Sequence, residues 1–295
     1  MQAILPFPDI SPEIFSIDLA GFHLALRWYA LAYILGLVLA WRWVVLMVRR
    51  PGLWLNDSPP MSAKQVEDLL TWVILGVILG GRLGFVLFYQ PGYYFENPRE
   101  IPLIWQGGMS FHGGFLGVIL AGYLFARRHK LRVASLGDCM AATAGIGLFF
   151  GRLANFINAE LWGRPSHLPW AVAFPGELAE TCPPDWQGVC ARHPSQLYEA
   201  GLEGLLMVIL MYYLAYRRGW LKTPGALIGA FFLIYGAARS FVELFRQPDQ
   251  QFASLDNPMG YALHLGDIGL SMGQVLSLPM VLIGGFVIWR TRRCG

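Results

Sequence analysis

Seven stretches of this 295-residue chain are apolar over about 20 residues, the length of helix that crosses the roughly 30 Å hydrocarbon core of a bilayer. Only 14% of the residues are charged, against about 25% in an ordinary soluble protein. So few charges cannot cover a surface that faces water. The sequence therefore predicts an all-α integral membrane protein whose seven transmembrane helices lie within residues 20–47, 69–89, 110–126, 136–157, 196–216, 225–245 and 268–289.

Positive charges are divided unequally between the loops that join these windows. One alternating set of loops, together with the C-terminal tail, holds thirteen Lys and Arg residues within 49–64, 127–132, 217–222 and 290–293. The other set holds four arginines beside many acidic residues. Because basic loops stay in the cytoplasm, the N-terminus is predicted outside and the C-terminus inside. We expect one polytopic membrane domain over 1–295, with a small external head or lid at 158–195.

The composition also excludes other classes of protein. The net charge is only +3, without the concentrated basic face of a nucleic-acid-binding protein, so no nucleic-acid partner is expected. No C-x-x-C or H-E-x-x-H pattern occurs, so neither a metal nor another cofactor is expected. Cys182 and Cys190 fall in the external segment, where an oxidising compartment would let them pair, but their spacing alone leaves this open.

Arg42 lies near the inner end of the first span, from where it can reach the interface, but Arg82, Arg152 and Arg239 lie deeper in their predicted spans. A charge at the centre of a bilayer costs about 2.5 to 3.5 kcal/mol on insertion scales, so such a residue is a functional hypothesis by default. The predicted topology places all three in the outer halves of their helices, with few evident partners. Because guanidinium groups suit bidentate contacts with phosphate, we expect a polar cavity that faces the outer leaflet and binds an anionic ligand.

Helical spacing groups other polar residues with these arginines. Tyr235, Arg239 and Glu243 follow one another at i,i+4 on one helix face, and Arg152 and Asn155 form an i,i+3 pair. Each of these faces must be turned towards protein or water. A structural alternative for Arg239 and Glu243 is a buried ion pair that only fixes helix packing.

Glycines are dense at 80–84, 107–114 and 145–151. In a membrane span, glycine usually indicates close helix contact, which we expect at 80–84 and 145–151. In GGMSFHGG at 107–114 the glycines flank His112 at a membrane boundary, where kinked backbone that lines a cavity is allowed. His112 is therefore the best candidate for a general base, although a lone histidine is more often structural.

The run GRLANFINAELWGR at 151–164 closely resembles the signature of the prolipoprotein diacylglyceryl transferases. Two departures from the family pattern are small: Ala154 replaces a usual glycine, and Ser240 follows Arg239 where an aromatic residue is common. Other motifs of this family occur in the family's order, namely WYALAY at 28–33, RLG at 82–84, GGMSFHGG at 107–114, HPSQLYE at 193–199, YGAAR at 235–239 and SMGQVLSLPM at 271–280.

The resemblance implies a bacterial inner-membrane transferase with its active site towards the periplasm. Such an enzyme moves the diacylglyceryl group of phosphatidylglycerol to the lipobox cysteine thiol of a prolipoprotein signal peptide, forming a thioether and releasing glycerol phosphate. Its partners are then these two substrates and membrane lipids. The implied catalytic residues are His112, Arg152, Tyr235 and Arg239, and the implied substrate-binding residues are Tyr29, Arg82, Asn155, Glu160, Gly163 and Glu243.

Two other classes of function use the same features. An anion or lipid transporter would use the same intramembrane arginines, but it should also have polar groups in the inner halves of the spans, where only Arg42 is evident. A structural or lipid-scaffolding protein would tolerate the replacement of Arg152 or Arg239 by alanine. A transferase would lose catalytic activity when either arginine is replaced by alanine.

Overall fold

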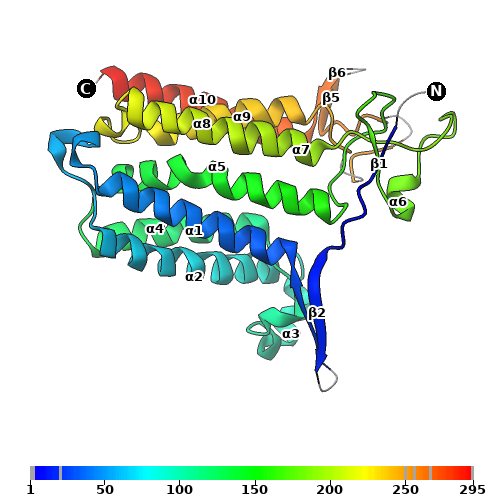
Figure 1. Ribbon diagram of the computed structural model, residues 1–295, viewed down its shortest axis with the longest axis horizontal. Helices are drawn as coiled ribbons and strands as arrows, with labels where there is room; N and C mark the ends of the chain where they lie inside the picture. Colours follow the sequence, from blue (N-terminus) through cyan, green and yellow to red (C-terminus); the bar gives the residue numbers. More distant parts are fainter. Residues whose placement is uncertain (1–3, 20–21, 249–250, 255–256, 266–267, 294–295) are drawn as a thin grey trace. The chain divides into compact units, whose positions relative to one another are not determined.

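The computed structural model describes residues 4–19, 22–248, 251–254, 257–265 and 268–293. It divides into two compact units, one made of Met1–Ala40 and Ala141–Gly295 and the other of Trp41–Met140. Two helices, α1 (Trp28–Val48) and α5 (Val133–Ile157), each run from one unit into the other. Figure 1 shows the course of the chain.

The first unit is built on long helices that carry the predicted spans one, four, five, six and seven. Residues Ser195–Arg217 form one continuous helix in which two segments are wound as π-helix, a form that often marks functional sites. The elements of this helix and those that follow it are α7 (Ser195–Glu199), η5 (Ala200–Leu206), α8 (Met207–Tyr212), η6 (Tyr213–Arg217), η7 (Trp220–Lys222), α9 (Ala226–Val242) and α10 (Met272–Arg293).

Glycines bring the helices of the first unit together. A Cβ at Gly204 would lie 2.6 Å from the Cα of Phe149, so α5 and η5 touch backbone to backbone. A Cβ at Gly236 would lie 2.9 Å from the carbonyl oxygen of Ser277, at the contact of α9 with α10, which run side by side in Figure 1. Close contact at Gly145 is confirmed, whereas a side chain at Gly147 or Gly151 would meet open space.

The first unit also contains three two-stranded sheets, which the all-α prediction did not include. Strands β2 (Glu13–Leu19) and β3 (Phe22–Arg27) form an antiparallel hairpin. β1 (Leu5–Pro6) pairs with β4 (Val172–Ala173), and β5 (Leu263–Leu265) pairs with β6 (Ile268–Leu270). Apolar residues at the start of windows 20–47 and 268–289 therefore belong to strands, and the corresponding helices begin only at Trp28 and Met272.

The segment 158–195 of the first unit carries little regular structure, with only β4 and the short helix α6 (Glu177–Glu180). Cys182 and Cys190 form a disulfide, which settles the pairing that their spacing left open. The buried guanidinium of Arg192 lies 4.0 Å from the ring centroid of Trp162. It also donates to the carbonyl oxygens of Leu178, Ala179 and Thr181, so one buried cation holds this segment together.

The second unit is a helical hairpin of α2 (Ala63–Phe88) and α4 (Phe111–Arg128). A Cβ at Gly80 would lie 2.8 Å from the Cα of Gly117, and a Cβ at Gly84 would lie 2.7 Å from the Cα of Gly113. The predicted close contact at 80–84 is thus confirmed. The connections contain the short helices η1 (Pro51–Leu53), η2 (Leu55–Asp57), α3 (Pro91–Glu96), η3 (Pro98–Glu100) and η4 (Ile104–Gln106).

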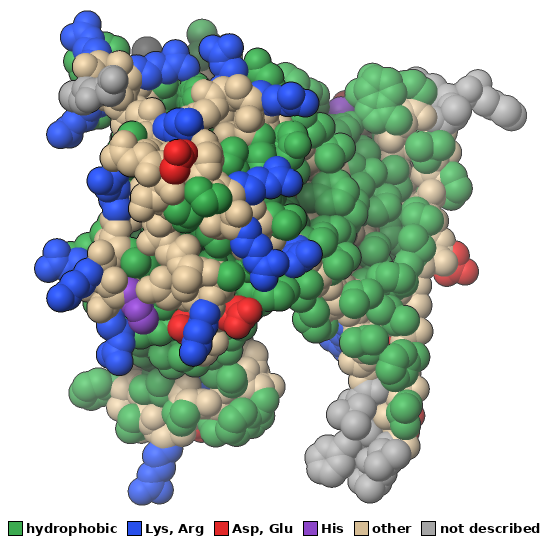
Figure 2. Space-filling view, turned by 60° about the vertical axis from the view of Figure 1, so that its left-hand side comes forward, with side chains coloured by type: hydrophobic (Ala, Val, Ile, Leu, Met, Phe, Trp, Pro, Cys, Tyr) green, Lys and Arg blue, Asp and Glu red, His purple; other side chains and the backbone are tan. Residues whose placement is uncertain are grey.

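Among the described residues, five helices are long and apolar enough to cross a membrane: α1, α2, α5, Ser195–Arg217 and α10. α9 is apolar but has only 17 residues, and α4, with 18 residues, is not among the five. Figure 2 shows broad surfaces of hydrophobic side chains and, apart from them, concentrations of Lys and Arg. The chain is therefore mostly helical with several candidate spans, while the count of seven and the orientation stay predictions.

Candidate active site

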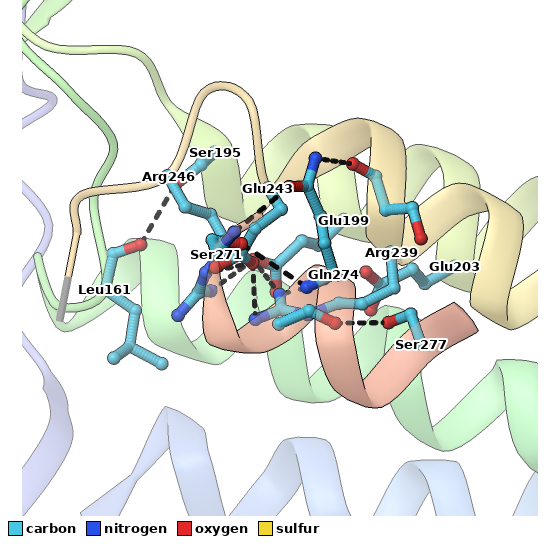
Figure 3. A network of polar contacts seen from close by, with 12 residues as sticks. Leu161, Ser195, Glu199, Glu203, Arg239, Glu243, Arg246, Ser271, Gln274 and Ser277 are labelled. Atoms are coloured by element: carbon cyan, nitrogen blue, oxygen red, sulfur yellow. Dashed lines mark hydrogen bonds and ion pairs between the residues drawn. The ribbon is translucent and has the colours of Figure 1, made fainter. Parts of the chain in front are cut away.

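A cluster of charged side chains lies where α7, α9 and the start of α10 meet in the first unit (Figure 3). At its centre is Glu199, the last residue of α7, which is 0% exposed. Its carboxylate forms ion pairs with Arg152 and Arg246, and one oxygen lies 3.2 Å from Nη1 of Arg239. One arginine from α5 and two from α9 and the residues just after it thus converge on one buried carboxylate.

Two further glutamates complete the cluster. Glu243 Oε2 lies 2.9 Å from Nη2 of Arg239 and 3.4 Å from Nε of Arg246. Glu203 is fully buried, and its Oε1 lies 4.0 Å from Nη1 of Arg239. Neither oxygen of Glu203 has a hydrogen-bond partner among the described residues. Three arginines and three glutamates balance in formal charge, so the expectation of few partners is wrong for Arg152 and Arg239.

Glu199 is more deeply buried than the arginines that pair with it. The side chain of Glu199 is 1% exposed, whereas those of Arg152 and Arg239 are 20% and 17% exposed. A molecule that reaches the cluster therefore meets guanidinium groups first. Because the buried carboxylates hold these groups in place, the arrangement is preorganised for an anion such as phosphate.

Local sequence explains why α9 and α10 can meet at this point. Residues 235, 239 and 243 lie at i,i+4, which places Arg239 and Glu243 on one face of α9. A Cβ at Gly273 would lie 2.5 Å from the carboxylate carbon of Glu243, so a side chain at position 273 would displace this carboxylate from its place beside α10. At the start of α10, Ser271 and Gln274 exchange side chain to backbone hydrogen bonds as a capping box.

A second branch of polar contacts leaves the cluster at Arg152. Its Nη1 donates to Asn155 Oδ1 at 3.2 Å, which confirms the predicted pair. The Asn155 amide nitrogen then donates to the Tyr29 hydroxyl at 3.3 Å and to Glu160 Oε1 at 2.7 Å. Four of the predicted site residues, from α1, α5 and the segment after α5, are therefore connected by hydrogen bonds.

The contact between Gly163 and Arg246 brings the segment 158–195 to the cluster. Gly163 pairs with Arg246 in an antiparallel bridge, and its amide donates to the carbonyl oxygen of His193 at 2.8 Å. A Cβ at Gly163 would collide with the carbonyl oxygen of Phe245, so glycine is required at this approach. His193 Nδ1 lies 3.1 Å from the Tyr198 hydroxyl, and burial lowers the pKa of the His193 imidazole, so the ring favours its neutral form.

Tyr235 also lies on α9, four residues before Arg239, with its ring stacked on Phe231 at 5.6 Å between centroids.

Two predicted site residues belong to the second unit. Arg82 in α2 donates to the carbonyl oxygens of Glu100, Ile101 and Gly107 at 2.6 to 2.8 Å, and to that of Gly108 at 3.2 Å. His112 lies exposed in the first turn of α4. Before it, Gly107 and Gly108 adopt φ of 87° and 79°, a left-handed conformation that favours glycine.

Comparison with known proteins identifies the family. The sequence model of the prolipoprotein diacylglyceryl transferases matches residues 15–290. The chain belongs to this family. It is 60% identical over 292 residues to proteins named phosphatidylglycerol--prolipoprotein diacylglyceryl transferase in Roseobacter denitrificans and Ruegeria pomeroyi, with 99% of each chain covered. A relative of the same name in Rhizobium meliloti is 49% identical over 290 residues, with 98% of this chain and 95% of the relative covered.

Within this member of the family, the structure joins most of the predicted site residues into the contacts around Glu199 and Asn155. The prediction missed Arg246 and did not include Glu199 among the site residues. Arg246 had a usable signal, because it follows Glu243 by three positions. Glu199 had one as well, since it opens a predicted span four residues before another glutamate.

Proposed function

We propose that this chain transfers the diacylglyceryl group from phosphatidylglycerol to the lipobox cysteine of a prolipoprotein. The cysteine sulfur forms a bond with the terminal glycerol carbon of the diacylglyceryl group. The bond between that carbon and the phosphate oxygen breaks, and the electron pair leaves with glycerol phosphate. The thiol proton passes to a base. The family membership and the names of the relatives support this reaction.

The observation that carries the proposal is the partly exposed set of guanidinium groups in front of the buried Glu199. In this proposal, Arg152 and Arg239 bind the lipid phosphate and stabilise the negative charge that develops on the leaving group. Glu243 positions Arg239, and Asn155 and Tyr235 orient the headgroup. Tyr29, Glu160 and Gly163 shape the mouth of the site.

His112 is the proposed base for the thiol. An unperturbed thiol has a pKa near 8.5, so at neutral pH most of it needs deprotonation before it can attack. Replacing His112 by glutamine should therefore suppress transfer more at pH 7 than at pH 9, where the thiol ionises unaided. Equal loss at both values would indicate a structural role for His112.

In the proposed membrane arrangement, α4 and α9 cross the bilayer together with the five long apolar helices, which gives seven spans. The N-terminus lies in the periplasm and the C-terminus in the cytoplasm, in agreement with the unequal loop charges. The segment 158–195 is then a periplasmic head on one membrane domain. The active site faces the periplasm of the inner membrane, where a signal peptide and an outer-leaflet lipid can both reach it.

The test is a transfer assay with purified protein, phosphatidylglycerol and a synthetic lipobox peptide. Mass spectrometry should find the peptide heavier by one diacylglyceryl group on its cysteine, and a peptide with serine in place of cysteine should remain unmodified. Folded protein that forms no such product would refute the proposed function.

A further inference from the structure

A cleft of about 500 Å³ lies next to the Asn155 contacts in the first unit. Its polar lining comes from Arg27 at the end of β3, Tyr29 and Tyr33 in the first turns of α1, and Asn158 and Glu160 after α5. The Glu199 cluster is not part of this lining. The cleft is therefore a separate recess that shares two residues, Tyr29 and Glu160, with the hydrogen bonds leading to Arg152.

Glu160 is held in this cleft at a conformational cost. Its neighbours Ala159 and Leu161 have φ of 53° and 57°, a left-handed conformation that costs about 1 kcal/mol or more for a residue other than glycine. Hydrogen bonds fix the residue: Gln196 Nε2 donates to its carbonyl oxygen at 2.6 Å, and Asn155 donates to its Oε1 at 2.7 Å. Strain of this kind persists only where the surroundings determine the conformation, and it clusters at ligand sites.

The second carboxylate oxygen of Glu160 is available to a ligand. No hydrogen bond to Oε2 joins Glu160 to another part of the described chain, and the residue is exposed. A carboxylate accepts hydrogen bonds and donates none, so this oxygen calls for a hydroxyl or an ammonium group. The lining also contains Arg27, whose Nη2 lies 3.1 Å from Glu13 Oε1, so this cation already has an acidic partner. The hydroxyls of Tyr29 and Tyr33 and the amide of Asn158 suit a ligand rich in hydroxyl groups.

We infer that this cleft binds the uncharged polyol headgroup of the donor phospholipid, and that Glu160 determines headgroup specificity by accepting a hydrogen bond from a headgroup hydroxyl. The inference rests on the proposed function. In phosphatidylglycerol the terminal glycerol is bonded directly to the phosphate. A phosphate on Arg152 would therefore place the glycerol beside Asn155, whose amide joins Arg152 to Glu160.

The test compares two donors that differ only in these hydroxyls. Phosphatidylpropanol has the same phosphodiester, acyl chains and three-carbon headgroup as phosphatidylglycerol, but its headgroup has no hydroxyl. A hydrogen bond to a charged group is worth a factor of about ten or more, so the wild type should use phosphatidylglycerol with at least about tenfold higher kcat/KM. Equal use of both donors would overturn the inference. Failure to modify the peptide with phosphatidylglycerol would instead refute the proposed function.

Variants then assign the preference to the cleft. Glu160→Gln should reduce the ratio of the two kcat/KM values about tenfold, whereas Glu177→Gln, a matched change on α6, should keep the wild-type ratio. Tyr33→Phe removes one hydroxyl from a side chain that is 62% exposed and should reduce the ratio about threefold, which tests the cleft even if Glu160→Gln does not fold. An unchanged ratio in both cleft variants, or a higher KM for the peptide alone, would overturn the inference.

Discussion

Arg82 in the second unit and the arginines of the Glu199 cluster in the first unit have different kinds of partner. In the second unit, Arg82 is 4% exposed, donates to four backbone carbonyl oxygens and lies 5.0 Å from the ring centroid of Tyr94. In the first unit, Arg152, Arg239 and Arg246 pair with carboxylates and keep part of their surface exposed. Backbone carbonyl oxygens accept the hydrogen bonds of the Arg82 guanidinium group. The cluster arginines form ion pairs and still keep part of their side chains exposed.

This difference separates two uses of an arginine inside a membrane protein. The carbonyl oxygens around Arg82 belong to 100–108, so the guanidinium fixes the loop that leads to His112. Around Glu199 the guanidinium groups are held by side-chain carboxylates, and in the proposed function the lipid phosphate binds the exposed side of these groups. We propose on this basis that Arg82 stabilises the fold, instead of binding substrate as its position in a span suggested.

The largest expected effect is the loss of transfer when the exposed arginines are changed. Arg152→Gln or Arg239→Gln should lower kcat/KM for phosphatidylglycerol by about 100- to 1,000-fold, as for the removal of a donor that stabilises transition-state charge. The transfer assay measures this at equal amounts of folded protein. Arg99→Gln, at an exposed position of η3, is the control and should leave kcat/KM within about twofold. A similar loss of kcat/KM in all three variants would contradict a specific role for the arginines of the Glu199 cluster.

Arg82→Gln should act on stability. It leaves several carbonyl oxygens without their donor, and we expect a loss of about 2 to 3 kcal/mol in the free energy of unfolding. Unfolding in a detergent of fixed composition measures the loss, and kcat/KM per folded molecule should fall less than tenfold. A protein of normal stability that has lost its activity would place Arg82 in the active site after all.

Helix packing gives a smaller effect that sharpens the structural side of the comparison. Gly80→Ala would place a Cβ 2.8 Å from the Cα of Gly117, so α2 and α4, which hold Arg82 and His112, must separate. We expect a loss of about 1 to 3 kcal/mol in unfolding free energy. Gly147→Ala meets open space and is the matched control. Equal effects of the two changes would contradict the packing described for this unit.

The smallest effect concerns pH. Because burial lowers the pKa of His193 in the folded protein, the unfolded chain binds a proton at higher pH than the folded one does. Stability should therefore fall as the pH decreases below about 6.5, the usual pKa of histidine. His193→Gln should make the unfolding free energy less dependent on pH between 7 and 5. An unchanged pH dependence would show that His193 titrates alike in both states.

Sequence patterns predicted the parts of this molecule that depend on local spacing. The apolar windows found the helices, and i,i+3 and i,i+4 spacing found the contacts of Arg152 with Asn155 and of Arg239 with Glu243. The prediction was wrong at β3 and β6, which it included in the apolar windows 20–47 and 268–289 as parts of helices. Hydropathy alone does not distinguish a short apolar strand from the start of a helix.

The central role of Glu199 could not be predicted in the same way. Its arginine partners are 47 residues before it and 40 and 47 residues after it, so no local pattern joins them. Arg246 reaches the cluster through its antiparallel bridge with Gly163. This bridge requires the backbone at Gly163 to lie very close to the backbone at Phe245. Distant ion pairs of this kind are visible only once the helices are packed.

The most direct test is the affinity of the purified protein for phosphatidylglycerol in nanodiscs of otherwise neutral lipid, measured for the wild type, Arg239→Gln and Arg82→Gln. If the Glu199 cluster binds the phosphate, Arg239→Gln should raise Kd about tenfold or more. Folded Arg82→Gln should raise it less than threefold. Equal weakening by both changes, or no weakening by Arg239→Gln, would contradict the assignment of the lipid phosphate to this cluster.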